Sequence, residues 1–459
     1  MTARIHGPKT VVLCLLIVYC IHKIVPYLGK TGTKNYPSRK YFYANVKTTI
    51  VSIHIDRSRF IETMEAQAEI GGTENGGLHR LTLSDADKDV RDWFLDAMEA
   101  AGLETRIDEM GNMFGRRSGT DPSADPILMG SHLDSQPYGG IYDGVLGVIA
   151  ALEFVRTLND QGIETSHPIE IVNWTNEEGS RFQPAMQGSG VWTGELDLET
   201  EYDKTDADGT RFEDELERIG YKGDVPAEPT TEYASSLELH IEQGPKLENN
   251  GKDVGVVTGV VGLTWGAVTF YGAAEHTGTT PMHDRQDALV AAADFITTVR
   301  RLGGTLGKET VASVGCADVS PNSINIVPEE VTVTWGIRDP SDDIVEEGRE
   351  RVLEAAAAIA EQEGVDYEWE DRARSASIRF PDGPVTAIRD AARELGYDSM
   401  DVFSGAVHDA AKVGTICDTA MVFAVSEDGK SHTEEEYTSW DDCYSAANTL
   451  ANAALDLAE

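Results

Sequence analysis

Apolar residues follow two different spacings along most of the chain. Over residues 85–101 they recur at the spacing of a helix that buries one side, and residues 145–158 predict a longer, strongly apolar helix. Short apolar runs of strand length lie at 127–129, 169–174, 237–241 and 421–425, and a further helical segment lies around 385–395. Strands that alternate with helices in this way predict an α/β domain built on a mostly parallel sheet.

The middle of the chain has a different order of elements. The pattern predicts a strand, a helix, two strands and a helix, at 266–271, 287–301, 310–319, 331–337 and 343–363. This two-layer order is that of a small α+β, ferredoxin-like module. Because the α/β pattern resumes afterwards, we expect a main domain over 51–254 and 371–459, interrupted by an inserted domain over 255–370. The acidic, polar stretch 198–232 is expected to be an exposed excursion.

The first fifty residues differ from the rest in composition. They hold eight basic residues and no acidic one, together with an apolar run from Val11 to Ile21. This run is too short for a membrane-spanning helix, which needs about 20 residues. It is compatible with the core of a signal peptide, although no clear cleavage site follows, and also with a start codon assigned too early, the true chain beginning near Val51. We leave residues 1–50 out of the predicted fold and expect no membrane span in the folded body.

The chain is strongly acidic, with 38 Lys and Arg residues against 79 Asp and Glu residues and a net charge of −41. Repulsion of phosphates argues against nucleic-acid binding. Only eight Lys residues follow residue 50. A lysine-poor, acidic body is typical of proteins adapted to high salt, where screening makes self-repulsion tolerable. The three Cys residues outside the leader are widely spaced, which predicts no disulfide framework and suits a reducing cytoplasm.

Side chains able to bind a metal follow most of the predicted strands. His132 comes just after the strand 127–129, and Glu177 and Glu178 follow the strand 169–174. The others are Asp143 before the apolar helix, His240 on the polar side of the strand 237–241, and His432 after the strand 421–425. Ligands of open α/β sheets bind beyond the carboxyl ends of the strands, so we expect these groups to meet.

Each of these residues has a plainer explanation when it is taken alone. A single His at a strand end is more often a hydrogen-bonded surface residue, an Asp before Gly usually belongs to a turn, and paired Glu residues in a loop are commonly solvated. Together, however, these imidazoles and carboxylates form the ligand mixture that suits zinc or manganese. Asp134, two residues after His132, is close enough to orient a ligating imidazole.

Seven motifs, in order along residues 55–459, resemble those of one family. They are GSHLDSQPYGGIYDG, NEEGSRF, HIEQGP, EHTGTTPM, PNSINIVP, SGAVHDA and SHTEEEY. The set is similar to the amidase/hydantoinase–carbamoylase branch of the M20 dinuclear metallohydrolases, which contains N-carbamoyl-L-amino-acid hydrolases, allantoate amidohydrolases and β-ureidopropionases. The leader has no counterpart there. The resemblance implies that the main domain is catalytic and that the insertion is a lid and dimerisation domain.

The resemblance also implies a set of metal-binding residues. Two divalent ions per subunit, zinc or manganese with cobalt or nickel also acceptable, would be bridged by Asp143. His132 and His240 would bind one ion, and Glu178 and His432 would bind the other. A carboxylate suits the bridging position because it has two oxygens. Glu177 would stay free as the general base that activates water and then protonates the leaving nitrogen.

Further residues match positions that hold the substrate in the family. His276, in a Gly- and Thr-rich loop of the insertion, would donate to the developing oxyanion from the partner subunit of a homodimer. The other matches are Gln243, Asn325, Arg338 and the amides of Gly405 and Ala406. The guanidinium of Arg338 suits a bidentate grip on a substrate carboxylate, although a surface ion pair is the plainer interpretation in so acidic a chain.

Four positions depart from the usual motifs of the family. Val407 stands for Gly in SGAVHDA, Gly336 for the Asp two residues before Arg338, and Thr277 for the Ala after the lid histidine. The Pro that usually follows the last motif's His is missing, with Glu434 and Glu435 nearby. None of these changes removes a predicted ligand or the base, but each could shift the choice of substrate.

We therefore predict a homodimeric, two-metal amidohydrolase that cleaves a linear amide or ureido C–N bond of a small, carboxylate-bearing substrate. An N-carbamoyl-L-amino acid is the first choice, with release of ammonia and carbon dioxide. Allantoate or β-ureidopropionate hydrolysis is the nearest alternative, and a dipeptidase or aminoacylase of the wider superfamily is a further one, which HIEQGP and NEEGSRF disfavour. A catalytically silent binding protein is the alternative from another class, and the retained Glu177 argues against it.

Overall fold

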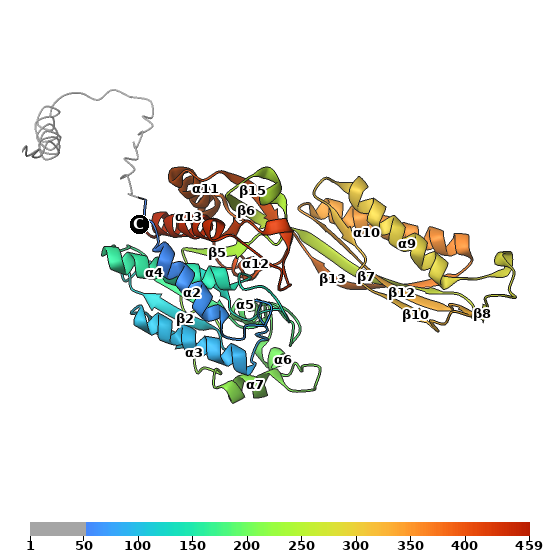
Figure 1. Cartoon of the computed structure of the whole chain (residues 1–459), viewed down its shortest axis with the longest axis horizontal. Helices are drawn as coiled ribbons and strands as arrows, with labels where there is room; N and C mark the ends of the chain where they lie inside the picture. The colour runs from blue at the N-terminus through green and yellow to red at the C-terminus, as the bar shows by residue number, and fades with distance from the viewer. Residues whose placement is uncertain (1–51) are drawn as a thin grey trace, which may run out of the picture. The chain divides into compact units, whose positions relative to one another are not determined.

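The computed structural model describes residues 52–459 (Figure 1). The predictions made for residues 1–50, including the signal peptide and the misassigned start codon, lie outside the described residues. Within residues 52–459, no helix combines the length and the apolar character that are needed to cross a bilayer.

In the described part of the chain, nine strands form the larger sheet. They are β1 (Glu104–Ile107), β2 (Met113–Arg117), β3 (Ile127–His132), β4 (Ile169–Trp174), β5 (Ser235–Ile241), β6 (Val254–Val260), β14 (Ile378–Arg379), β15 (Ser399–Ser404) and β16 (Thr419–Ala424). Their order is β1-β2-β4-β3-β5-β16-β6-β14, and β15 also pairs with β6. The four central strands are mutually parallel, whereas β2 and β6 attach to them antiparallel. The sheet is therefore mixed, with a parallel centre.

Helices cover this sheet, and its central strands are buried. The longer ones are α2 (Arg57–Ala68), α3 (Asp85–Ala100), α4 (Val145–Gln161), α11 (Asp382–Leu395) and α13 (Trp440–Ala458); the short ones are α5 (Gln187–Trp192), α8 (Lys246–Asn250) and α12 (Asp409–Val413). α4 packs against β3, β4 and β5, and every residue of these three strands is buried. Strands covered on both faces are usually rich in apolar residues, and short apolar runs predicted these three, although β4 and β5 also contain the buried Glu170 and Glu238.

A smaller, five-stranded sheet is built from residues between 262 and 375. Its strands are β7 (Gly262–Tyr271), β9 (Val311–Ser313), β10 (Ala317–Ser320), β12 (Glu330–Asp339) and β13 (Asp366–Ser375), and its helices are α9 (Ala288–Leu306) and α10 (Asp342–Glu363). Val268, Phe270 and Val333 of the sheet form one core with Phe295 of α9 and Val352 of α10. A two-strand ribbon, β8 (Glu275–His276) with β11 (Ile326–Val327), lies beyond the Tyr271 end of β7 (Figure 1).

The predicted fold class, a mostly parallel α/β domain with an inserted α+β unit, is confirmed. Two details of the insertion differ from the prediction. The strand expected over 310–319 is split, because β9 and β10 pair with separate parts of β12 around an interruption at Gly315 and Cys316. The charged strand β13 was not predicted, since its sequence lacks a buried apolar run. The domain boundaries and the dimerisation role stay predictions.

Two segments of chain connect the sheets, and they lie side by side. β6 leads through Val261 into β7, and β13 leads back through residues 376–377 into β14. On one side of this crossing Val260 pairs with Ile378, and on the other Leu263 pairs with Ser375. The insertion therefore leaves and rejoins the larger sheet at adjacent positions.

The stretch 198–232 is largely exposed or half-buried, as its charge predicts, but it is folded and has a buried apolar side. It contains α6 (Leu198–Tyr202) and α7 (Phe212–Ile219), and the apolar side of α7 is buried. Phe212 packs edge-on against Phe182, with 5.2 Å between the ring centroids. Arg181 pairs with Asp206 and Glu215 at distances of 3.1 and 2.8 Å, which ties the acidic segment to the main domain. The sequence prediction missed these two helices because it gave more weight to the charge of the segment than to its apolar residues at helical spacing.

Candidate metal centre

The predicted metal-binding side chains meet at one edge of the larger sheet. His132 is the last residue of β3, Glu178 follows β4, and His240 lies near the end of β5. Asp143 directly precedes Gly144 at the start of α4, and His432 lies in the loop after β16. Because the central strands are parallel, their carboxyl ends share an edge, which explains how residues far apart in sequence converge.

Asp143 lies at the middle of this group. Its Oδ1 is 3.0 Å from Nε2 of His240 and 3.5 Å from Nε2 of His132. Its Oδ2 is 3.3 Å from Nε2 of His432, which lies 3.8 Å from Oε2 of Glu178. Two sets of potential ligand atoms result, His132–Asp143–His240 and Asp143–Glu178–His432, each within 4.8 Å. The Asp143 carboxylate therefore directs one oxygen to each set.

The spacing and burial of these atoms fit divalent cations. Neighbouring ligand atoms around a tetrahedral ion with bonds of about 2.0–2.1 Å are about 3.3 Å apart. The separations of 3.0–3.8 Å around Asp143 are close to that value. Nε2 of His132 is buried without a hydrogen-bond partner in the described part of the chain. An orphaned, buried polar atom is costly unless a ligand satisfies it, so the residues present fit a metal.

Hydrogen bonds to the other ring nitrogens set the orientation of two imidazoles. Nδ1 of His132 is 2.9 Å from the carbonyl oxygen of Asp134, and Nδ1 of His240 is 3.0 Å from the carbonyl oxygen of Ile241. A carbonyl only accepts, so both Nδ1 atoms carry the proton and both Nε2 atoms keep a lone pair. This leaves the two Nε2 atoms available for a cation beside Asp143.

Gly144 is required for this packing. Its backbone has φ of +66°, and a Cβ atom there would lie 2.2 Å from Nε2 of His132. Its N–H donates to Nε2 of His240 at 3.2 Å. The start of α4 follows immediately, and the N-terminal end of a helix favours the negative charge of Asp143.

The centre contains more buried acid than the neighbouring imidazoles balance. Burial, followed by the charge of Asp143, raises the pKa of Glu178 to about 7 and that of Glu436 to about 7. Burial, followed by the charge of Glu238, raises the pKa of Asp409 to about 8. Asp143 itself is held well below its usual pKa, because its three histidine neighbours, His240 first, outweigh its burial. Such crowding of carboxylates is relieved when cations bind among them.

Glu177 lies beside the first ligand set without belonging to it. Its Oε2 is 3.5 Å from Nε2 of His132, and the side chain is nearly buried. Burial raises its pKa well above the usual value, and the negative charge of Asp409 adds to the shift, while His132 opposes it. A carboxylate whose proton affinity is raised in this way is suited to accept a proton from water.

The hydrogen bonds of the Asp134 carboxylate differ from those predicted. Its carboxylate was expected to orient His132, but Oδ1 is 3.7 Å from Nδ1 of His132 and the ring bonds to the Asp134 carbonyl instead. The two carboxylate oxygens accept the backbone N–H groups of Glu177 and Glu178, each at 3.3 Å. Asp134 therefore joins the loop after β3 to the loop after β4. Arg80, fully buried, donates to the carbonyl of Leu133 and holds the first loop.

The residues predicted to hold substrate fall into two groups. Gln243 belongs to the centre, since its Nε2 donates to Oδ2 of Asp143 at 2.7 Å and lies 3.2 Å from Nε2 of His432. Arg338 on β12 reaches the larger domain, where its Nη1 donates to the carbonyl oxygen of Gly405 at 2.6 Å. The amide of Ala406 is engaged by the hydroxyl of Ser404 at 3.2 Å. Arg338 thus meets the predicted segment 405–406 through a carbonyl rather than an amide.

His276 and Asn325 lie together but away from the metal centre. Nδ2 of Asn325 is 3.2 Å from Nε2 of His276, and both side chains are exposed. They follow β7, whose ten residues extend for about 33 Å from the crossing between the sheets. The structure therefore does not bring these two residues to the metal centre of their own chain.

Several residues at the centre were missed by sequence reasoning. Oε1 of Glu436 accepts the backbone N–H groups of Tyr142 and Asp143, each at 3.2 Å. The hydroxyl oxygen of Ser431 lies 3.0 Å from Oδ2 of Asp143 and 2.9 Å from Oε2 of Glu436, and its single proton can be donated to either carboxylate. The ring of His408 packs against that of His240 at a tilt of 53°, with 4.3 Å between centroids. These residues stand in the quoted motifs SHTEEEY and SGAVHDA, so the signal was present, but their roles depend on contacts that only the fold reveals.

Known proteins share this fold and these motifs. Residues 128–456 match peptidase family M20/M25/M40. The N-carbamoyl-L-amino-acid amidohydrolase of Rhizobium meliloti is 42 % identical over 405 residues, covering 88 % of this chain and 97 % of that protein. The allantoate amidohydrolase of Bacillus subtilis is 32 % identical over 384 residues, covering 83 % and 93 %.

A solved structure agrees with these sequence matches. The crystal structure of an amidase of the hydantoinase/carbamoylase family from Burkholderia multivorans superposes with a TM-score of 0.85 at 42 % identity. The match covers 88 % of this chain and 98 % of that one. The chain therefore belongs to peptidase family M20/M25/M40 and, within it, to the hydantoinase/carbamoylase amidases.

Proposed function

We propose that this protein is a metal-dependent amidohydrolase that cleaves the linear ureido C–N bond of N-carbamoyl-L-amino acids. One observation carries the proposal: Asp143 directs one carboxylate oxygen to each of two ligand sets, and the separate carboxylate of Glu177 lies beside them. A silent binding protein would need the ligands but not this base. Zinc, manganese, cobalt and nickel all suit the donor set.

The proposed roles follow from the contacts of each residue. His132 and His240 would hold one cation and Glu178 and His432 the other, with Asp143 between them. When bound, the two cations would polarise the substrate carbonyl and lower the pKa of a water molecule. Glu177 would take a proton from that water and deliver it to the leaving nitrogen. Asp134 would hold Glu177 in place through its backbone N–H.

Substrate binding would involve both sheets. Arg338 would pair with the substrate carboxylate next to Gly405, because a guanidinium donates two parallel hydrogen bonds to a carboxylate. Gln243 would orient the reacting end beside Asp143. Hydrolysis of the carbamoyl group would release the amino acid, ammonia and carbon dioxide.

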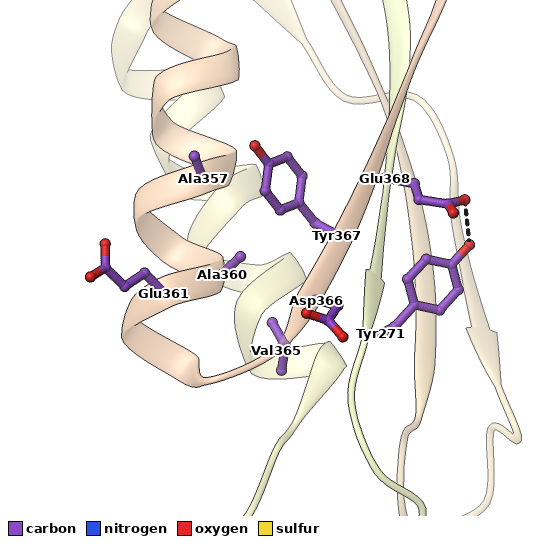
Figure 2. Close-up of a pocket in the computed structure, with 8 residues that line it drawn as sticks. All are labelled: Tyr271, Ala357, Ala360, Glu361, Val365, Asp366, Tyr367 and Glu368. Carbon is purple, nitrogen blue, oxygen red and sulfur yellow. Dashed lines mark hydrogen bonds between the residues drawn. The ribbon is translucent and has the colours of Figure 1, made fainter.

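We also propose that the active form is a homodimer. His276 would complete the site of the partner subunit, since it lies far along the insertion from the metal centre of its own chain. Among residues 52–459, strand β13 is one of the two terminal strands in the order β10-β12-β7-β13 of the smaller sheet, and it is much longer than β10 at the other edge. Between it and α10 lies a hollow of about 840 Å³, into which Tyr367 projects while Tyr271 donates to Glu368 (Figure 2). A free sheet edge is a template for pairing, and a second copy of the chain would cover it.

Release of ammonia from a panel of substrates tests the function. The panel contains N-carbamoyl-L-amino acids, β-ureidopropionate, allantoate and dipeptides, each assayed with and without a chelator. We expect N-carbamoyl-L-amino acids to be cleaved fastest, with activity lost on chelation and restored by added zinc or manganese. Faster cleavage of dipeptides than of all ureido compounds would contradict the proposal.

Allantoate is the second candidate substrate. It is favoured by the 32 % identity to the allantoate amidohydrolase of Bacillus subtilis over most of both chains. Allantoate also carries a carboxylate and ureido groups, so the same residues could act on it. The substrate panel separates the two, because allantoate would then exceed every N-carbamoyl-L-amino acid in kcat/KM.

A further inference from the structure

A groove on the smaller sheet lies next to the proposed carboxylate site. It has a volume of about 310 Å³ and is lined by Trp265, Ser313, Gly315, Gly336, Arg338 and Arg372, among others. In the register of β7 with β12, Gly336 is opposite Trp265 and Arg338 is opposite Leu263. The groove therefore begins within a few residues of the crossing between the two sheets.

Trp265 forms an aromatic wall of this groove. Its side chain is 43 % exposed, although large aromatic side chains on a sheet are usually covered. The centroid of its ring lies 5.5 Å from the guanidinium carbon of Arg338, which is the arrangement of a cation–π contact. Arg338 thus touches Trp265 on one side and Gly405 on the other.

The absence of a side chain at Gly336 allows this position of the indole. A Cβ atom on Gly336 would lie 2.6 Å from Cδ1 and 2.9 Å from Nε1 of Trp265, closer than any real contact. The Asp that the family motif leads one to expect at this position would displace the ring. The position of the Trp265 ring therefore depends on the glycine at position 336, where the family motif has Asp.

Arg338 has no acidic partner within ion-pair distance among residues 52–459, even though the chain has twice as many acidic as basic residues. Its recorded hydrogen bond is to the carbonyl oxygen of Gly405. Arg372, by contrast, is paired with Glu370 at 3.1 Å. Within the described residues, the groove therefore presents the guanidinium of Arg338, which has no acidic partner, at the end near the larger domain. The aromatic surface of Trp265 lies beyond it.

The free cation faces the loop that leads to the metal centre. Residues 405–408 connect Gly405 to His408, whose ring packs against that of His240. A substrate whose carboxylate pairs with Arg338 and whose carbamoyl group lies beside Asp143 would have its α-carbon between these points. Its side chain would then have the groove and the face of Trp265 within reach.

We propose that this groove is the subsite for the side chain of the substrate, and that Trp265 selects N-carbamoyl-L-amino acids with aromatic side chains. The inference rests on the proposed function and names the substrate class within it. A planar side chain stacks on the indole, whereas an acidic one would find Arg372 already neutralised by Glu370. Gly336 determines specificity indirectly, because it leaves room for the indole.

The test compares Trp265→Ala and Trp265→Phe with the wild type on two substrates, N-carbamoyl-L-phenylalanine and N-carbamoylglycine. We expect Trp265→Ala to lower kcat/KM for the phenylalanine derivative by about 10-fold or more, mainly through KM, since one stacking contact and its buried area are lost. For the glycine derivative, which has no side chain, only the contact of Trp265 with Arg338 is lost, so kcat/KM should fall by a clearly smaller factor than for the phenylalanine derivative. Trp265→Phe should restore most of the aromatic preference.

A second variant tests the arrangement independently. Gly336→Ala adds only a Cβ atom, and it should reduce the preference for the phenylalanine derivative by displacing the indole, with the metal content unchanged. Equal losses on both substrates in either variant would overturn the subsite. A wild type that cleaves N-carbamoylglycine as fast as the phenylalanine derivative would overturn the subsite while leaving the proposed function intact. A wild type that cleaves neither of these two but does cleave other N-carbamoyl-L-amino acids would overturn the subsite alone, whereas one that cleaves no N-carbamoyl-L-amino acid would overturn both proposals.

Discussion

The two sheets present their functional side chains in opposite ways. At the edge of the larger sheet, His132, Asp143 and His240 are buried, and the orientation of each imidazole is set by a backbone carbonyl. On the smaller sheet and its ribbon, His276 is exposed and Trp265 is 43 % exposed. A buried, interlocked centre is organised before any substrate arrives. Under the proposals above, the exposed groups would gain their final contacts only from substrate or from a second chain.

This difference suggests that the chemical step and the selection of substrates are assigned to different sheets. Chemistry that needs ion-to-ligand distances fixed to a few tenths of an ångström is placed where packing is tight. Selection among substrates is placed on a surface where a single substitution, such as that at Gly336, can change the shape without disturbing the ligands.

The largest effect is expected at the base beside the buried centre. Glu177→Gln should lower kcat by roughly 10²–10⁴-fold, because the amide cannot accept the proton of the attacking water. Metal content, measured by elemental analysis of the purified protein, should stay at the wild-type level. Glu178→Gln is the matched control, since it removes a proposed ligand and should lower metal content as well. Full activity of Glu177→Gln would show that the base lies elsewhere.

The next largest effect is expected at His276, which is exposed on the ribbon beyond the smaller sheet. His276→Ala should lower kcat by roughly 10²–10³-fold, the usual consequence of losing one donor to an oxyanion, with metal content and melting temperature unchanged. Mixing this variant with Glu177→Gln after dissociation and reassociation should restore about a quarter of the wild-type activity. Half of the randomly paired dimers are mixed, and each mixed dimer has one intact site. If mixing restores nothing, His276 does not act across subunits.

A smaller effect is expected at the link between two loops of the centre. In Asp134 each carboxylate oxygen accepts one backbone N–H, that of Glu177 or that of Glu178. The amide of Asp134→Asn has a single acceptor oxygen, so one of the two N–H groups loses its partner. Metal affinity should fall about 10- to 100-fold, as is typical when a residue supporting the ligands is changed. Competition with a chelator of known affinity measures it. The exposed Asp197→Asn, which changes only a helix cap, should leave the affinity unaltered, and an equal loss in both variants would remove the special role of Asp134.

The smallest effect concerns the whole surface. Since the net charge is −41, added salt should screen self-repulsion and raise the melting temperature, by roughly 5–10 °C between dilute buffer and molar salt. Calorimetry at several salt concentrations would show whether both sheets respond in a single transition. A melting temperature that falls as salt is added would contradict the inferred adaptation to high salt.

Much of the fold could be predicted because the buried parallel strands contain short, largely apolar runs separated by helical segments. The convergence of His132, Glu178 and His240 followed from one geometric rule, that parallel strands end at a common edge. The roles assigned to these residues remain predictions, but their proximity needed no information beyond the strand pattern.

Other features could not be read from sequence because they depend on register or on packing. The contact of Trp265 with Gly336 exists only because β7 and β12 pair at that register. Glu436 supports the backbone at Asp143 across a large separation in sequence, and nothing in SHTEEEY distinguishes it from its two acidic neighbours. Strand β13 was not predicted because it lies at one edge of its sheet, where a strand can be exposed and its sequence can be charged.

The paired crossing between the sheets has a consequence for engineering and for descent. Because Val260 pairs with Ile378 and Leu263 with Ser375, the inserted unit begins and ends at neighbouring points. Units whose two ends are close can be excised or exchanged with little effect on the host. Chimeras that swap residues 262–375 between relatives would carry the aromatic groove and His276 as a single cassette. Such a cassette would let substrate choice be inherited separately from the ions and their ligands.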